Sequence, residues 1–193
     1  MKEERALYYN SVYTAGGANK SYHKHYSKSQ YIEIWNKALE LIKGIKNCSI
    51  LDVGCGPGQF ANLLFDNNIN NYMGLDFSTV AIDLAKKINP RYKEKFLCDD
   101  IYTSNVYKKG YNVIIMLEVL EHLQEDMKVL KNIEKESNVI FSVPNFICKG
   151  HVRCFKNKFE IVNRYKDIID IKQIFEYKLS STGKIYLVDS IKI

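Results

Sequence analysis

The stretch ILDVGCGPGQF, at positions 50–60, begins as an apolar run with β-branched residues and then places a glycine at every second position. The run predicts a buried strand, and the glycines predict a tight turn in which the backbone adopts positive φ and approaches a ligand closely. The residues after Gly58 predict the start of a helix, whose unpaired N–H groups bind polar or anionic groups. The stretch therefore predicts a strand, a turn and a helix that together hold a nucleotide-like ligand.

Two residues set this stretch apart from the glycine-rich loop of dinucleotide-binding folds. Asp52 stands two positions before the first glycine, where such a fold usually has an apolar residue, and Gln59 stands where GxGxxG requires its third glycine. A nicotinamide-dependent oxidoreductase is the alternative from the same broad fold. It fits poorly, because 193 residues leave little room for a substrate domain after a nucleotide-binding half.

Acidic residues also stand at the ends of the next three expected strands. The strand over 71–76 ends at Asp76, the strand over 96–101 contains Asp99 and Asp100, and the strand over 111–117 runs into Glu118. Parallel strands bind ligands at their carboxyl ends, and a carboxylate at the tip of the second strand can accept both hydroxyls of a ribose. The sequence therefore predicts a nucleoside site at this edge of a parallel sheet.

With these motifs the chain resembles the class I S-adenosylmethionine-dependent methyltransferases, from about residue 49 to the C-terminus. The resemblance implies S-adenosylmethionine as cofactor, with the glycine turn under its methionine part, Asp76 on its ribose and Asp100 on its adenine. The cofactor-binding residues that it implies are Asp52, Gly54, Cys55, Gly56, Gly58, Gln59, Phe60, Asp76, Phe77, Ser78, Asp100, Ile101, Leu117 and Glu118.

Hydrophobic periodicity predicts strands that alternate with helices and then a different tail. Helices are expected over 30–42, 58–65, 78–87, 119–135 and 158–165, and the remaining strands over 138–143, 168–177 and 184–192. The last two strands flank a turn at 180–183 and predict a hairpin. The expected fold is α/β: a Rossmann-like, seven-stranded, mostly parallel sheet with helices on both faces and a C-terminal antiparallel hairpin.

Length and composition predict one domain over 1–193, with a helical lid segment over 1–46 and a cofactor-binding core over 47–193. With 46% hydrophobic and 26% charged residues the chain can bury a full core. No window is apolar enough for a membrane span, and five cysteines without a CxxC motif indicate reduced thiols, so a cytoplasmic protein without membrane contacts is expected. The net charge of +6 fits an anionic partner, but an A/T-rich genome explains it as well.

The acceptor pocket is expected to come from the N-terminal segment, because nothing is inserted between the late strands. This segment is rich in tyrosine and histidine, whose polar tips suit a lid that excludes water when closed. Tyr31 and Trp35 are expected to pack the first helix onto the sheet instead. The expected acceptor-binding residues are Tyr8, Tyr9, Tyr13, Tyr22, His23, His25, Tyr26, Asn145, Arg153 and Arg164.

The run LEVLEHL at 117–123 supplies the candidate base. On a helix over 119–135, its apolar residues form a buried stripe and Glu118, Glu121 and His122 lie on the opposite face. Histidine is the natural base near neutral pH, so His122 and His151 are the predicted catalytic residues. The alternative interpretation of these polar residues is a solvated helix face.

The same run resembles two methyltransferase groups, those of ubiquinone biosynthesis, which methylate oxygen, and those that methylate the 2′-oxygen of small RNAs. In the latter, two glutamates and a histidine hold a divalent metal together with a later histidine. The resemblance implies a possible metal site at Glu118, Glu121, His122 and His151, with donors that suit Mn²⁺, Fe²⁺ or Zn²⁺ better than Mg²⁺. Relatives without a metal carry the run too.

The sequence as a whole predicts an S-adenosylmethionine-dependent methyltransferase that acts on an oxygen of a small polar or anionic metabolite. Two alternatives stay open. One is an RNA 2′-O-methyltransferase, which the charge and the metal-like run allow, although no appended RNA-binding module is visible. The other is a cofactor-binding subunit without catalysis. The acceptor, the choice between oxygen and nitrogen, and the oligomeric state are not encoded in any motif.

Overall fold

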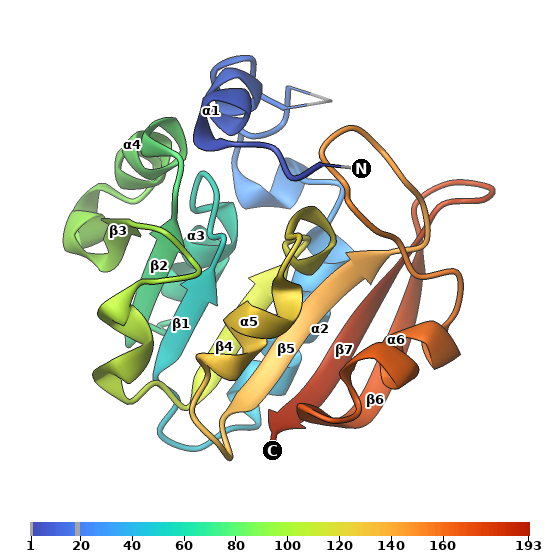
Figure 1. Cartoon of the computed structure of the whole chain (residues 1–193). Coiled ribbons are helices and arrows are strands. Elements are labelled where there is room, and N and C mark those ends of the chain that lie inside the picture. The colour runs from blue at the N-terminus through green and yellow to red at the C-terminus, as the bar shows by residue number, and fades with distance from the viewer. Residues whose placement is uncertain (1, 18–19) are drawn as a thin grey trace.

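A seven-stranded sheet runs through the computed structural model, which describes residues 2–17 and 20–193 (Figure 1). The strand order is β3-β2-β1-β4-β5-β7-β6. Neighbours from β3 to β5 pair in parallel, whereas β7 pairs antiparallel with β5 and with β6. The predicted fold class is confirmed. The strands are β1 (Ile50–Val53), β2 (Tyr72–Asp76), β3 (Phe96–Cys98), β4 (Val113–Leu117), β5 (Asn138–Pro144), β6 (Ile169–Lys178) and β7 (Lys184–Lys192).

Helices cover both faces of the sheet. Ile34, Phe60 and Ile82 bury one face under α2, α3 and α4, while Leu130 and Ile161 belong to the core cluster on the other face, under α5 and α6. The α-helices are α1 (Ala6–Thr14), α2 (Ile32–Lys43), α3 (Gln59–Asp66), α4 (Thr79–Ile88), α5 (Asp126–Lys131) and α6 (Lys158–Tyr165). The 3₁₀ helices are η1 (Tyr26–Lys28), η2 (Pro90–Lys95), η3 (Asn105–Lys109) and η4 (Leu120–His122). None of these helices has the length and the apolar run that crossing a bilayer requires.

The predicted helix over 119–135 is wrong in its first half. Glu118 has a φ of +56°, which no helix continues, and its backbone N–H donates to Ser142 Oγ at 2.9 Å. The chain then forms only η4, and Leu123 is extended again before α5 begins at Asp126. As a result Glu121 points inward with 0% of its surface exposed, instead of lying on a solvated helix face.

Helix α1 was not predicted, because no residue on it is buried and its hydrophobic pattern is weak. In Figure 1 it lies above the carboxyl ends of β1 and β4, beside the N-terminal end of α4. Contacts between α1 and α4 hold it there, among them the hydrogen bond from the Ser78 hydroxyl to Asn10 Oδ1 at 2.6 Å. The N-terminal segment therefore covers the edge of the sheet at which the site was expected.

A buried ionic network ties α5 to α6 and to the loop before α5. Asp126, 0% exposed, accepts two hydrogen bonds from Arg164, at 2.8 and 2.6 Å, and one from the Tyr165 hydroxyl at 2.8 Å. Arg153 lies 3.3 Å from the same carboxylate and donates to the carbonyl of Gln124 at 3.0 Å. It also donates to the carbonyls of Leu120 and Leu123. The network fixes the irregular loop over 118–125.

Asp126→Ala is predicted to destabilise the fold strongly, because it leaves two guanidinium groups and a hydroxyl without their shared acceptor. We expect a loss of about 3 kcal/mol in the free energy of unfolding, measured by urea denaturation. Glu125→Ala is the matched control: its side chain is 64% exposed, so its effect should stay within about 0.5 kcal/mol. Equal effects of the two substitutions would contradict this view of the network.

Candidate active site

A cavity of about 550 Å³ lies at the carboxyl ends of β1, β2 and β4. Its floor comes from the glycine turn between β1 and α3 and from the residues that follow β4. Its cover comes from the N-terminal segment with α1, and one side comes from residues 148, 149 and 151, in the loop between β5 and α6. Open parallel sheets bind ligands at this edge, so the cavity occupies the place where the sequence put the site.

The glycine turn requires its glycines for conformation and for space. Gly54, Gly56 and Gly58 have φ values of +75°, +52° and +72°. A Cβ on Gly54 would lie 2.5 Å from the Val119 side chain, and one on Gly56 would lie 3.2 Å from the Tyr13 hydroxyl. The turn is therefore closely packed between the loop after β4 and the N-terminal segment.

Two buried carboxylates from the first two strands line the cavity. Asp76 Oδ2 accepts from the Gly56 backbone N–H at 2.9 Å, and its Oδ1 accepts from the Ser78 N–H at 2.8 Å. Asp52 accepts from the Tyr72 hydroxyl at 2.7 Å. Burial raises the pKa of Asp76 to about 6 and that of Asp52 to about 7. Both groups are placed to accept hydrogen bonds from a polar ligand.

Glu121, His122 and His151 meet on the other side of the cavity. One ligand atom from each lies within 4.8 Å of the others, and His122 Nε2 is 3.8 Å from Glu121 Oε1. Both carboxylate oxygens of Glu121 are buried and have no hydrogen-bond partner within the described part of the chain. The pKa of Glu121 is raised well above its usual range, mainly because the group is buried and to a smaller extent because the negative charge of Glu118 is near.

Backbone carbonyls orient the two imidazoles. His122 Nδ1 lies 3.0 Å from the Gly150 carbonyl, and His151 Nδ1 lies 3.1 Å from that of Phe146. A carbonyl can only accept, so these contacts favour the Nδ1–H tautomer and leave both Nε2 atoms with a lone pair. Burial lowers the pKa of His122 to about 4 and lowers that of His151 as well. Both rings are therefore neutral at pH 7, the form that a base or a metal ligand needs.

Glu118 stands slightly apart from this group. Its Oε1 accepts from the Ser142 hydroxyl at 2.7 Å, and it is not among the residues whose ligand atoms lie within 4.8 Å of one another. Its pKa is raised by burial. The structure thus brings all four predicted metal ligands into one cavity but groups only three of them tightly.

The N-terminal segment is fastened over the cavity by polar contacts. Gln59 Nε2 donates to the carbonyls of Ser21 and Lys24, at 3.0 and 2.6 Å. The Tyr9 hydroxyl lies 2.9 Å from His122 Nδ1, and Glu3 accepts from the Tyr102 hydroxyl at 2.6 Å. These few bonds join the segment to the start of α3, to η4 and to the loop after β3, as a lid would require.

Most of the predicted site residues line the cavity. From the cofactor set these are Asp52, Gly54, Cys55, Gly56, Gln59, Phe60, Asp76, Phe77, Ile101, Leu117 and Glu118. From the acceptor, base and metal sets these are Tyr8, Tyr9, Tyr13, Tyr22, Glu121, His122 and His151.

Three predicted cofactor residues lie outside the lining and have structural roles. Gly58 is the N-cap of α3, and a Cβ there would meet Ala85 of α4 at 2.9 Å. Ser78 is the N-cap of α4, where its side chain accepts from the Ala81 N–H. Asp100 is exposed and accepts from the Tyr102 N–H at 2.7 Å.

The two arginines predicted to face the acceptor point elsewhere. Arg153 and Arg164 pair with Asp126, as described above, because a buried carboxylate competes successfully for them. His23 and His25 are exposed, and Tyr26 lies outside the lining. Asn145 is bonded to the hairpin, with its Oδ1 accepting from the Lys184 N–H at 2.7 Å.

The sequence analysis missed several lining residues. Tyr31 and Trp35 were assigned to the core, and they do pack there, but each also reaches the cavity. No sequence signal marked the others, of which Val12 lies on α1 and most of the rest on irregular segments. The further lining residues are Glu3, Glu4, Val12, Ala15, Gly17, Pro57, Val119, Leu123, Cys148 and Lys149.

Comparisons with known proteins agree with this geometry. Residues 51–135 match the family model described as a methyltransferase domain. The chain is 29% identical, over 118 residues, to the ubiquinone biosynthesis O-methyltransferase of Coxiella burnetii, and 26% identical, over 161 residues, to an uncharacterised protein of Methanocaldococcus jannaschii. Residues 51–135 therefore resemble a methyltransferase domain, the class that the sequence predicted.

Solved structures share the fold of the whole chain. The magnesium protoporphyrin IX methyltransferase of Synechocystis with bound S-adenosylmethionine superposes with a TM-score of 0.71 at 13% identity, over 100% of this chain and 99% of that one. The (4+2) cyclase SpnF superposes with a TM-score of 0.73 at 12% identity, over 97% and 95%. The alignment with the Coxiella enzyme covers 56% of this chain and 48% of that enzyme. The alignment with the Methanocaldococcus protein covers 79% of this chain and 65% of that protein. The chain therefore spans less than two thirds of the length of either relative.

We expect residues 8–26 to close over the methyltransferase site when cofactor binds. Hydrogen exchange of this segment should slow when S-adenosylhomocysteine is added, because the lid is held by few bonds without a ligand. Gln59→Ala should speed its exchange in both states by removing the two bonds to Ser21 and Lys24. Equally strong protection with and without the cofactor product would instead mean that the segment is ordinary core.

Proposed function

We propose that the chain transfers the methyl group of S-adenosylmethionine to an oxygen of a small polar metabolite in this cavity. The observation that carries the proposal is the joining of two half-sites in one cavity. A glycine turn with Asp76 lies on one side, and neutral His122 and His151 with Glu121 lie on the other. Residues 1–46 act as the lid and residues 47–193 as the core in this proposal.

The residues present fit the cofactor. Gly54 and Gly56 line the cavity with positive-φ backbone, and Asp76 stands at the tip of β2, where a ribose would lie. When bound, S-adenosylmethionine supplies an electrophilic methyl group, and the electron pair of the broken carbon–sulfur bond stays on sulfur. The remaining work of the chain is to orient the acceptor, exclude water and remove a proton.

His122 is the proposed base. Its Nε2 carries the lone pair, lines the cavity and lies 3.8 Å from Glu121, which stabilises the imidazolium formed when the proton arrives. The Gly150 carbonyl keeps the ring in this tautomer. The Tyr9 hydroxyl, 2.9 Å from Nδ1, connects the lid to the base, so lid closure and base orientation are joined through one residue.

A metal-assisted version of the same reaction is the second candidate, favoured by the grouping of Glu121, His122 and His151 within 4.8 Å. Two imidazoles and a carboxylate suit Mn²⁺, Fe²⁺ or Zn²⁺, and a metal held there would lower the pKa of an acceptor hydroxyl. An RNA acceptor is less well supported, because Lys149 is the one cationic side chain among the described lining residues and a polyanion is bound by several.

Asp76→Ala is predicted to weaken binding of S-adenosylmethionine by at least roughly 1.5–3 kcal/mol, because two ribose hydroxyls lose a charged acceptor and the N–H groups of Gly56 and Ser78 lose theirs. Calorimetry measures the effect, and thermal denaturation checks that the variant folds. Asp99→Ala is the control: this exposed residue stands at the same sheet edge but outside the cavity, so affinity should be unchanged. Unchanged affinity in Asp76→Ala would show that Asp76 does not bind the ribose. Tighter binding of a nicotinamide dinucleotide than of S-adenosylmethionine would show that the chain is not a methyltransferase.

Substitutions at the histidines are predicted to separate a lone base from a metal centre. An acceptor is first identified by incubating metabolites and short RNAs with labelled cofactor. If His122 acts alone, His122→Ala loses on the order of 100- to 10,000-fold in rate, cofactor binding survives, and chelators have no effect. If a metal is held, His151→Ala and Glu121→Ala are nearly as damaging, and Mn²⁺ restores chelated enzyme. Full activity of His122→Ala would refute both versions.

A further inference from the structure

The cavity is acidic although the chain is basic. The chain has a net charge of +6, yet in the lining the carboxylic acids outnumber the cationic side chains, of which Lys149 is the one among the described residues. The two histidines of the lining are neutral, and Arg153 and Arg164 are bound to Asp126 outside it. The acids of the lining are Glu3, Glu4, Asp52, Asp76, Glu118 and Glu121.

Glu121 is the acid that most requires a positive partner. It is completely buried, and neither of its oxygens has a hydrogen-bond partner within the described residues. Arg153 lies close enough to interact electrostatically, but its guanidinium donates to Leu120, Leu123 and Gln124 carbonyls instead. An ionised carboxylate without a partner is costly at this depth, and the raised pKa of Glu121 reflects that cost. A cation that arrives with a ligand would favour the ionised form and pair with it.

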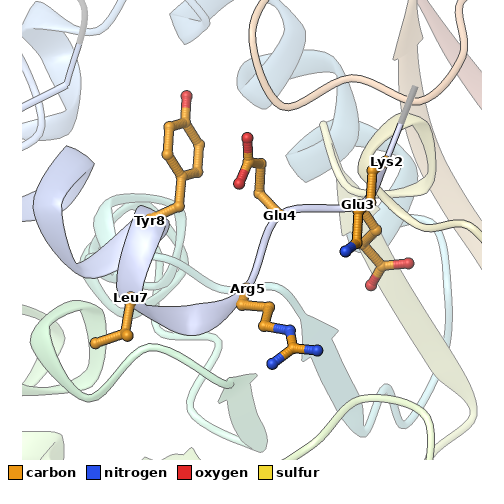
Figure 2. A pocket seen from close by; sticks show the side chains of 6 residues that line it. All are labelled: Lys2, Glu3, Glu4, Arg5, Leu7 and Tyr8. Carbon is orange, nitrogen blue, oxygen red and sulfur yellow. The ribbon is translucent and has the colours of Figure 1, made fainter.

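The aromatic walls suit an organic cation. The rings of Tyr8, Tyr9 and Tyr22 face the cavity from the lid, and Lys149 Nζ lies 5.0 Å from the centre of the Tyr8 ring. Figure 2 shows the Glu4 carboxylate on the same side of the N-terminal segment as the Tyr8 ring, while Arg5 and Leu7 point the other way. A cation of the chain itself, Lys149, thus already lies over one of these rings.

We propose that the acceptor is an organic cation, a small molecule whose ammonium group pairs with Glu121 and packs against the tyrosine faces of the lid. This inference rests on the proposed methyl transfer in its metal-free version. The positive charge beside Glu121 then belongs to the acceptor itself and not to a metal ion. It replaces the anionic acceptor expected from the sequence, since the arginines that would have bound an anion are paired with Asp126.

The test compares three probes that share a phenol ring and differ in charge: tyramine, 4-ethylphenol and 4-hydroxyphenylacetate. Each is titrated calorimetrically into protein saturated with S-adenosylhomocysteine, whose neutral sulfur contributes no charge. Tyramine should bind about tenfold tighter than 4-ethylphenol, and the anion should bind most weakly, because a buried charged contact is worth at least that factor. Equal or tighter binding of the anion, or no binding of any probe, would overturn the proposal.

Two variants assign the preference to Glu121. Glu121→Gln should reduce the affinity for tyramine to that for 4-ethylphenol, whereas Glu125→Gln, on the exposed side of the same loop, should leave all three affinities unchanged. A tyramine preference that survives Glu121→Gln would contradict the pairing. The titration with S-adenosylhomocysteine tests the proposed function separately. If S-adenosylhomocysteine does not bind, the proposed function is wrong; if it binds but tyramine is not preferred, only the proposal of a cationic acceptor is wrong.

A further set of titrations tests whether the cation at Glu121 is a metal ion. The titrations are repeated after chelation and after addition of Mn²⁺, with the metal content of the protein measured by mass spectrometry. The proposal requires the same tyramine preference in chelated protein and no stoichiometric metal that depends on Glu121. One bound metal per chain, lost in Glu121→Gln and excluding tyramine from the cavity, would show that the cation at Glu121 is a metal and overturn the proposal.

Discussion

The carboxylate of Asp76 joins the two turns on which the whole site depends. One of its oxygens holds the Gly56 N–H and the other the Ser78 N–H, while the backbone N–H groups of Gly54 and Cys55 donate to the Leu75 carbonyl. The turn after β1 and the turn after β2 are thereby fixed against each other. A buried charge used in this way keeps the glycine turn in its positive-φ conformation, ready to accept a ligand.

The second half of the site depends on a residue far away in sequence. Ser142, on β5, accepts from the Glu118 N–H and donates to its side chain, and this holds the positive φ that turns the chain after β4. Glu121 and His122 reach the cavity only because the chain turns there. Arg153, in the loop after β5, donates to three carbonyls of the loop over 118–125, so β5 and the loop after it together support the candidate base.

The parts of the fold that could be predicted from sequence are those set by local pattern. The three glycines, the acids at strand ends and the apolar periodicity gave the sheet, its hairpin and the cofactor side of the cavity. The helix over 119–135 was wrong because Leu123 is extended in a loop whose carbonyls bind Arg153, and periodicity carries no information on those contacts. The roles of Arg153 and Arg164 were missed because a charge pattern does not say which carboxylate is buried within reach.

A crystal structure of the chain with S-adenosylhomocysteine tests the central claim most directly, because it locates both halves of the ligand at once. The account predicts that the ribose hydroxyls lie within hydrogen-bond distance of Asp76 and that the sulfur faces the side of the cavity lined by Glu118 and His122. The lid over residues 8–26 should cover the ligand. Cofactor product bound elsewhere on the chain, or with its ribose away from Asp76, would contradict the account.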